Sequence, residues 1–328
     1  MRVHFAELRD HCAGLLAGAG ISAPAAHTAA GLVLDADLRG LRSHGVAMLP
    51  SYLDGLKAGG ISCLVEPSVV ADTGALVILD GRNGLGHLTS AYAVKQAAIR
   101  ARRTGIAAVG VRNAGHFGAA STWSVRLAEA GLVGIVLANS TPVMAAPGGC
   151  RAVVGTNPIS IAAADSTGRA VVADLASSVG SVAKIRSALR DGAAVPDGWA
   201  LDDSGVETTD PARALAGTLM PIGGAKGFAL ALMIDVLTGV LTGGGFGSDV
   251  SSFVRRPAAP NNCAHLFIAV ASTVAAGVDA LIEQVVASGE DVRAPGQWRS
   301  DLAAAQRRTG LEVSEDVLRR LGFAGEVW

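Results

Sequence analysis

The chain has 328 residues, of which 50% are hydrophobic, 17% are charged and 4% are aromatic, with a formal net charge of −1. This length and apolar content allow a large buried core, and the balanced charge without a long basic run argues against a nucleic-acid-binding protein. The four cysteines are scattered without a CxxC pair, so the sequence predicts no zinc site, no other metal site and no disulfide framework. These features are typical of a cytoplasmic globular protein without a nucleic-acid or membrane partner.

The N-terminal region, residues 1–65, is predicted to be helical. Phe5, Leu8 and Leu15 fall on one face of a helix that ends at a Gly-Ala-Gly turn. Ser22 is a typical N-cap residue for a second helix, with a proline just inside it. A short third helix is expected near the end of this region.

The residue pattern changes after this region and predicts an α/β core over residues 66–270. Compact apolar runs bounded by turn residues are typical of strands, and several are separated by stretches with helical spacing. The expected strands span 68–74, 75–81, 106–112, 132–140, 157–164, 169–176 and 265–271, with helices at 87–105 and 119–131. The order strand, helix, strand predicts a parallel sheet with helical crossovers.

Two further helical parts complete the expected organisation. The most apolar long stretch, residues 227–241 within a predicted helix at 225–241, is short for a membrane span and contains Asp235. This stretch is therefore predicted to be a buried core helix within the α/β core. Residues 271–328 are expected to form a C-terminal helical segment that packs back on the N-terminal region.

Common nucleotide-binding and hydrolase motifs are missing. Residues 18–23 read GAGISA, which matches G-x-G-x-x-A in letters only, because the stretch follows a predicted helix rather than a strand. Neither a P-loop motif nor a G-x-S-x-G motif occurs, so phosphate-loop and serine-hydrolase chemistry lose their main support.

Two of the seven histidines have settings that suit chemistry. His44 lies between Ser43 and a glycine at a junction of two predicted helices. His116 lies where a predicted strand turns into a helix, which is where ligand sites of α/β sheets gather, and Gly115 and Gly118 allow close backbone approach. Histidine titrates near neutral pH, so either residue can exchange a proton. On local sequence alone, a structural role stays open for both.

Polar clusters that follow strand-like runs suit a phosphate or a ribose. They are ANSTP at 138–142, GTNP at 155–158 and DLASS at 174–178, and each offers hydroxyls, amides or free backbone N–H groups. Lys226 lies among glycines at a predicted helix start, where its charge and the helix N-terminus both favour an anion. An ordinary turn is the alternative for each cluster, but the four together with the histidines indicate a polyanionic cofactor.

Taken in order, the motifs resemble a known family. LRSHGVAMLPSYL, VRNAGHFGAA, ANSTPVMAAPGG, GTNPISIA and MPIGGAKGFALALMIDVLTG are similar to those of the malate/L-lactate dehydrogenase family of the second type, and the resemblance spans nearly the whole chain. Its members include malate, sulfolactate and ureidoglycolate dehydrogenases and a cyclic-imine carboxylate reductase. The resemblance implies an oxidoreductase that uses NAD or NADP, a non-Rossmann α/β fold with a mixed-sheet nucleotide-binding core, and a homodimer with active sites near the subunit interface.

The resemblance also implies roles for individual residues. The catalytic histidine of the family corresponds to His116, with His44 as the second histidine of the site. The implied substrate contacts are Ser43, His44, Met48 and Thr156. The implied cofactor contacts are Gly118, Ala119, Ala120, Asn139, Ser140, Thr156, Asp174, Leu175, Ala176 and Lys226.

Three positions depart from the family pattern. Met48 stands where many relatives have an arginine that grips a substrate carboxylate, so that clamp is absent. Ala183 replaces a glycine before the retained Lys184, and Gln297 replaces a glutamate in a turn near the end of the chain. The first departure bears on the substrate and the last on ribose recognition.

The expected reaction is hydride transfer between NAD(P)H and a small 2-oxo or 2-hydroxy carboxylic acid such as malate, lactate or sulfolactate. A reductase of a cyclic imine carboxylate is the alternative within the family. From other classes, a cofactor-free lyase or hydrolase and a non-catalytic small-molecule binding protein stay open.

Overall fold

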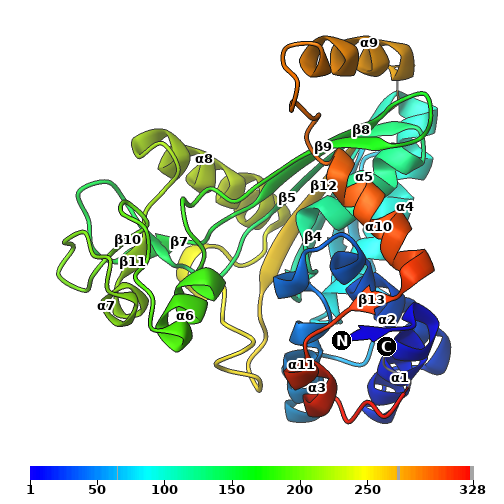
Figure 1. Cartoon of the computed structure of the whole chain (residues 1–328). Coiled ribbons are helices and arrows are strands. Elements are labelled where there is room, and N and C mark those ends of the chain that lie inside the picture. The colour runs from blue at the N-terminus through cyan, green and yellow to red at the C-terminus, as the bar shows by residue number, and fades with distance from the viewer. Residues whose placement is uncertain (65, 272–273, 326–328) are drawn as a thin grey trace.

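The computed structural model describes residues 1–64, 66–271 and 274–325. The expected boundary at residue 65 and residues 272–273 and 326–328 of the expected C-terminal segment lie outside the described residues. The division into three regions stays a prediction. Figure 1 shows a central sheet that runs through the molecule, with helices against it and a smaller part on the left of the view.

A seven-stranded mixed sheet forms the centre of the fold. In order across the sheet, its strands are β2 (Ser68–Asp72), β3 (Leu76–Asp80), β4 (Ile106–Ala114), β12 (Cys263–Ala271), β5 (Leu132–Ala138), β8 (Ile159–Ala164) and β9 (Ala170–Leu175). Every strand expected from an apolar run is present. The inner strands such as β3 and β5 are largely buried and leave this signature in the sequence, whereas the edge strand β2 is exposed along its length. The predicted mixed α/β fold is confirmed.

The prediction of a parallel sheet is wrong for most of this sheet. Among its described strands, only β3 and β4 are parallel neighbours, joined by helix α4 (Gly86–Thr104). β4 and β5 are linked through helix α5 (Ala120–Glu129), but β12 returns from far along the chain and lies between them, antiparallel to both. Strand pairing that depends on such a distant segment leaves no local signal in the sequence.

Helices α4 and α5 share one hydrophobic cluster with the sheet. Trp123 of α5 and Phe267 of β12 are fully buried in it, and Ala93 and Ala97 of α4 are fully buried in the same cluster. Because alanine is small, α4 lies close to the strands. This packing fixes the start of α5, where the expected site lies.

The N-terminal residues form the predicted helices. They are α1 (Phe5–Gly18), α2 (Ala23–Leu38) and α3 (Leu49–Ala58), with two short 3-10 turns, η1 (Arg42–His44) and η2 (Val46–Met48), between the last two. Ser22 is the N-cap residue of α2, as predicted, but its hydroxyl makes no capping hydrogen bond.

Segments near the end of the chain complete the N-terminal core. Strand β1 (Arg2–Val3) pairs with β13 (Leu311–Glu312), and α10 (Gln297–Thr309) packs against α2. Leu318 of α11 (Glu315–Arg320) is buried in the same cluster as α1 and α2. The remaining C-terminal helix, α9 (Ala275–Val286), instead packs against β8 and buries none of its residues; Figure 1 shows it apart from the body.

A smaller four-stranded sheet lies beside the main one, on the left in Figure 1. Its strands are β10 (Ala200–Leu201), β11 (Thr218–Leu219), β6 (Met144–Ala145) and β7 (Ala152–Val154), accompanied by helices α6 (Val182–Asp191) and α7 (Pro211–Ala216). Met144, Ile185 and Leu219 are buried in its own hydrophobic cluster. The loops from β5 to β6 and from β7 to β8 connect the two sheets, so they lie where the two parts meet.

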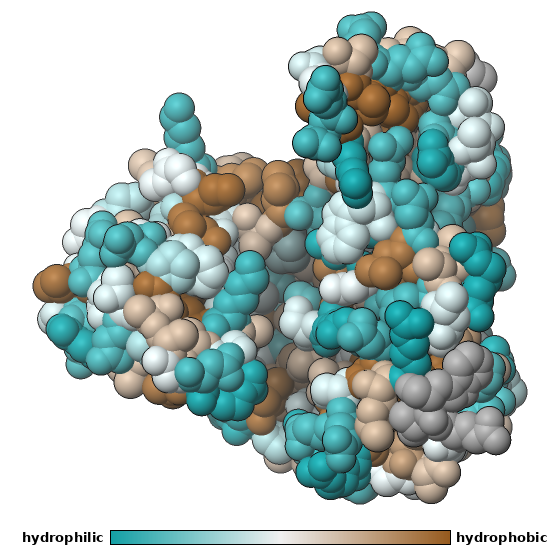
Figure 2. Space-filling model, in the orientation of Figure 1, coloured by the Kyte–Doolittle hydropathy of each residue, from teal (hydrophilic) through white to brown (hydrophobic). Residues whose placement is uncertain are grey.

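The prediction that residues 225–241 form a buried core helix is wrong. Helix α8 (Ala225–Asp235) continues into a π-helical turn, η3 (Val236–Val240), and only one side of this continuous helix is buried. Met233 is 50% exposed and Val240 is 51% exposed. A helix that is apolar on all sides normally lies inside a core, so its bare apolar side calls for a partner surface. Figure 2 shows this apolar patch beside the hollow in the face of the molecule.

Among the described helices, none has both the length and the apolar content that crossing a membrane requires.

Candidate active site

His116 lies in the turn between β4 and α5, and glycines determine its position. Gly118 has a φ of +79°, and a Cβ on it would lie 2.9 Å from Nε2 of the buried His87, so a larger residue does not fit. Gly86 begins α4 directly against this turn: a Cβ on it would lie 2.3 Å from the carbonyl oxygen of His116. The turn is therefore held tightly against α4.

Two aromatic residues that the sequence analysis missed enclose the His116 ring. The hydroxyl of Tyr52 lies 2.7 Å from Nδ1 of His116, and the backbone nitrogen of Gly118 lies 3.4 Å from the same atom. Phe253 stacks on His116 with ring centroids 5.0 Å apart and on Tyr52 at 5.6 Å. Nε2 is thus the ring nitrogen left for a substrate. Tyr52 lies one helical turn after Met48, which is a usable sequence signal; Phe253, in the loop after the 3-10 turn η4 (Gly247–Asp249), gives none.

The structure brings the two expected histidines together. His44 ends η1, and its ring stacks over that of His116 with centroids 6.0 Å apart. Ser43 Oγ lies 2.9 Å from Nδ1 of His44. The loop that carries His44 is held by Asp37, whose carboxylate accepts a hydrogen bond from the backbone N–H of Val46 at 2.6 Å. Ser43 thus contacts His44, whose ring lies over that of His116.

Burial keeps both histidines neutral near neutral pH. Burial lowers the pKa of His44, and the nearby Asp174 carboxylate opposes this shift. Burial lowers the pKa of His116 well below its ordinary value, and the neighbouring His44, His87 and His265 lower it further. A neutral imidazole can accept a proton from a reacting hydroxyl, so the pair suits acid–base chemistry.

The two polar loops after β5 and β7 also lie together. The hydroxyls of Ser140 and Thr156 are 3.4 Å apart. A Cβ on Gly155 would lie 2.2 Å from Ser140 Oγ, so the loops approach as closely as glycine allows. Asn139 is only 2% exposed, and its side-chain amide donates to Asp235 at 2.9 Å and to a backbone carbonyl at 2.8 Å. Its side chain is thus engaged inside the protein.

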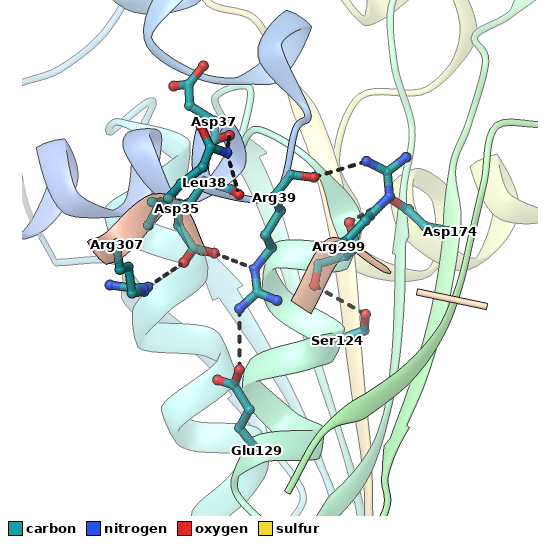
Figure 3. Close-up of polar contacts among 11 residues, drawn as sticks. Asp35, Asp37, Leu38, Arg39, Ser124, Glu129, Asp174, Arg299 and Arg307 are labelled. Atoms are coloured by element: carbon teal, nitrogen blue, oxygen red, sulfur yellow. Dashed lines mark hydrogen bonds and ion pairs between the residues drawn. The ribbon is translucent and has the colours of Figure 1, made fainter. Parts of the chain in front are cut away.

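Asp174, near the end of β9, lies beside the N-terminus of α5. Ser121, in the first turn of α5, donates its hydroxyl to the Asp174 carboxylate at 2.5 Å. Figure 3 shows Arg299 of α10 beside Asp174, with its guanidinium donating to the carbonyl oxygen of Arg39 at 3.0 Å. These residues line a small cavity of about 90 Å³ together with Gly296 and Ser300. Burial raises the pKa of Asp174, and the Ser121 hydrogen bond opposes this shift.

The positive charge of Arg39 in this network is balanced by carboxylates. Its guanidinium pairs with Asp35 at 3.0 Å and with Glu129 at 3.3 Å, and Arg307 also pairs with Asp35 at 3.3 Å (Figure 3). These pairs tie α10 to α2, and the end of α2 to the C-terminal end of α5. Arg299, by contrast, faces the cavity, where the Asp174 carboxylate is its acidic neighbour.

A family model described as malate/L-lactate dehydrogenase matches residues 3–322. The chain belongs to this family. It is accordingly an NAD(P)-dependent dehydrogenase of the hydroxy-acid type.

Three similar proteins are informative about this dehydrogenase. The L-sulfolactate dehydrogenase of Methanothermobacter thermautotrophicus is 36% identical over 306 residues, which cover 91% of this chain and 89% of that protein. The (2R)-3-sulfolactate dehydrogenase (NADP(+)) of Chromohalobacter salexigens is 36% identical over 301 residues, 90% of each chain. The crystal structure of delta1-piperideine-2-carboxylate reductase from Pseudomonas syringae is 29% identical with a TM-score of 0.90, and covers 98% of both chains.

The departures of this dehydrogenase from the family pattern lie in different surroundings. Met48 is partly buried and packs on the hydrophobic cluster of the N-terminal helices, as Phe253 does. Gln297 accepts the backbone N–H of Ala294 at 3.3 Å, so it holds its own turn. Lys184 lies in the first turn of α6 with Nζ 5.5 Å from the Trp199 ring centroid.

The remaining expected cofactor contacts are more exposed. Lys226 lies exposed in the first turn of α8 and makes no hydrogen bond or ion pair with another described residue. Leu175 and Ala176 are exposed directly after Asp174. No contact between described residues joins Lys226 to the histidine pair.

Proposed function

We propose that the chain interconverts a small 2-hydroxy acid and its 2-oxo acid at the His44–His116 pair, with NAD or NADP as the hydride partner. The observation that carries the proposal is the stacked pair of neutral histidines, with ring centroids 6.0 Å apart, beside the N-terminus of α5. The imidazoles are complementary to a reacting hydroxyl, and the helix N-terminus beside them is complementary to an anionic cofactor.

The residues present fit a dinucleotide. Ala119, the N-cap residue of α5, gives no side-chain cap, and the positive end of the helix dipole favours the negative charge of a diphosphate. Gly118 removes side-chain bulk at this point, and Asp174 can accept a ribose hydroxyl. Gly118, Ala119, Ala120, Asn139, Ser140, Thr156, Asp174, Leu175, Ala176 and Lys226 stay the predicted cofactor contacts. When bound, the nicotinamide supplies or takes up the hydride.

His116 exchanges the proton. In the oxidising direction the neutral ring carries its proton on Nδ1, directed at the Tyr52 hydroxyl, and accepts the proton of the substrate hydroxyl at Nε2; the Nδ1–H of the resulting imidazolium still donates to Tyr52. In the reducing direction His116 returns that proton to the new alkoxide. His44, held by Ser43 at Nδ1, orients the substrate oxygen or carries a proton. Ser43, His44, Met48 and Thr156 stay the predicted substrate contacts.

Reduction of a cyclic imine carboxylate is the second candidate. The likeness to the piperideine-carboxylate reductase supports it, as does the apolar surface of Met48 and Phe253, which suits the methylene groups of a cyclic imine.

We also propose that the protein is a cytoplasmic homodimer. The support for a dimer is the uncovered apolar side of α8 and η3, since monomers seldom leave so continuous an apolar surface in water.

The test is direct. Purified protein is titrated with NADH and with NADPH while nicotinamide fluorescence is followed, and absorbance loss is then measured with a panel of 2-oxo acids and cyclic imines. Turnover of a 2-oxo acid supports the main proposal, and turnover of imines alone supports the second. Binding without any turnover would favour a non-catalytic binding protein.

A further inference from the structure

Asp235 is a buried carboxylate in an otherwise apolar helix. It is 5% exposed, on the inward side of α8, opposite the bare apolar side. Its two oxygens accept the side-chain amides of Asn139 at 2.9 Å and Asn157 at 3.3 Å. An ionised carboxylate only accepts hydrogen bonds, so it matches two amide donors.

Each asparagine makes further hydrogen bonds that connect Asp235 to the polar loops. Oδ1 of Asn139, after β5, accepts the backbone N–H of Ala264 in β12 at 2.7 Å. Oδ1 of Asn157, after β7, accepts the backbone N–H of Ser140 at 3.0 Å, and its amide also donates to the carbonyl oxygen of Ala231 in α8 at 2.8 Å. One carboxylate therefore fixes both polar loops against α8 and against each other.

The π-helical turn after Asp235 tightens the same anchorage. It brings Gly239 so close that a Cβ there would lie 2.5 Å from the carbonyl oxygen of Gly245 and 3.2 Å from Nδ2 of Asn139. Short π-helical insertions occur often at functional sites. Here the widened turn presses the helix backbone onto Asn139.

We propose that Asp235 is a positioning residue for the nucleotide: its carboxylate, acting through Asn139 and Asn157, sets the separation of the Ser140 and Thr156 hydroxyls for cofactor binding. The inference rests on the proposed function, because it assumes that these loops receive NAD or NADP. Ser140 depends on the anchorage through its backbone N–H and Thr156 through its neighbour in the chain. Asp235 itself is buried behind the loops, so it acts through them.

The main test is Asp235→Asn in the full-length protein. The substitution keeps the size of the side chain but turns one acceptor into a donor, which then faces an amide donor of Asn139 or Asn157. The Kd of NADH or NADPH from fluorescence titration and the KM of the cofactor are expected to rise about tenfold or more, the scale for losing a hydrogen bond to a charged group. The value of kcat at saturating cofactor is expected to change much less.

Two further variants make the result specific. Asp249→Asn removes a carboxylate from an exposed position in η4 and is expected to leave the cofactor Kd unchanged. Asn157→Ser breaks the same anchorage from the loop side, without altering α8, and is expected to raise the Kd in the same way. It serves as the test if Asp235→Asn does not fold, as judged by circular dichroism and thermal unfolding.

The outcomes separate the two levels of the argument. If the wild-type protein binds a nucleotide and the folded Asp235→Asn or Asn157→Ser protein binds it equally well, Asp235 is a purely structural residue and the inference is overturned, even if the Tm has fallen. If the wild-type protein binds neither nucleotide, the proposed function is overturned, and this inference with it.

Discussion

Replacing Tyr52 by phenylalanine tests the proton chemistry most directly. The substitution removes the hydroxyl that lies 2.7 Å from Nδ1 of His116 and keeps a ring that can stack on Phe253. Tyr52 is fully buried, so water does not readily take the place of the lost oxygen. When His116 accepts the substrate proton, the Nδ1–H of the imidazolium then has no acceptor in this buried setting.

A hydrogen bond to a charged group contributes about 1.5–3 kcal/mol, so kcat for oxidation of the hydroxy acid is expected to fall roughly 10- to 100-fold. The KM of the substrate is expected to change little, because the charge develops only in the transition state. Steady-state rates are measured with the best substrate of the panel. Tyr92→Phe, at a half-buried position on α4, is the matched control. An unchanged kcat in folded Tyr52→Phe protein would refute the assignment of Tyr52 as the partner of His116.

Three further predictions follow from the same geometry. His116→Ala is expected to lower kcat by about 10² to 10⁴; a wild-type kcat across the panel would remove His116 from the mechanism. Burial lowers the pKa of His116 well below its ordinary value, so the ring is neutral, and able to act as a base, at every pH above that lowered pKa. We therefore expect kcat/KM for oxidation to stay level from neutral pH into the weakly acid range and to fall only at lower pH. An acid limb centred above neutrality in the pH profile would contradict this. Met233→Asp, on the bare side of α8, is expected to yield monomers in sedimentation or size-exclusion measurements, whereas Leu189→Asp on α6, 47% exposed, is not; dimers that persist in Met233→Asp would place the interface elsewhere.

The sequence allowed the individual elements to be predicted, because each has a local cause. The buried runs of β3, β4 and β5 and the Gly-Ala-Gly end of α1 are visible in a few neighbouring residues. The insertion of β12 between β4 and β5 depends on residues more than a hundred positions apart in the chain, so periodicity could not reveal it. Likewise, apolar composition does not say whether α8 is covered by its own chain or by another.

The residues of the candidate site likewise divide into those with a local sequence signal and those that only the fold brings to the site. His44 and His116 stand out locally, since each lies beside a glycine in a turn, and the structure stacks their rings. Tyr52 and Phe253 reach His116 only through tertiary packing. Asn139 was expected among the cofactor contacts from a polar cluster, but its amide is directed to Asp235, a partner that only the fold supplies.

The cluster shared by the two ends of the chain has a consequence for biosynthesis. Leu8 and Leu34 of the first helices share their core with Leu311 and Leu318, which leave the ribosome much later. The first helices therefore keep apolar faces in water until residues 311–318 have been synthesised. Long-range closure of this kind slows folding and exposes chains to aggregation. Nascent chains stalled before residue 311 are expected to bind chaperones through these helices even when the central sheet has already formed.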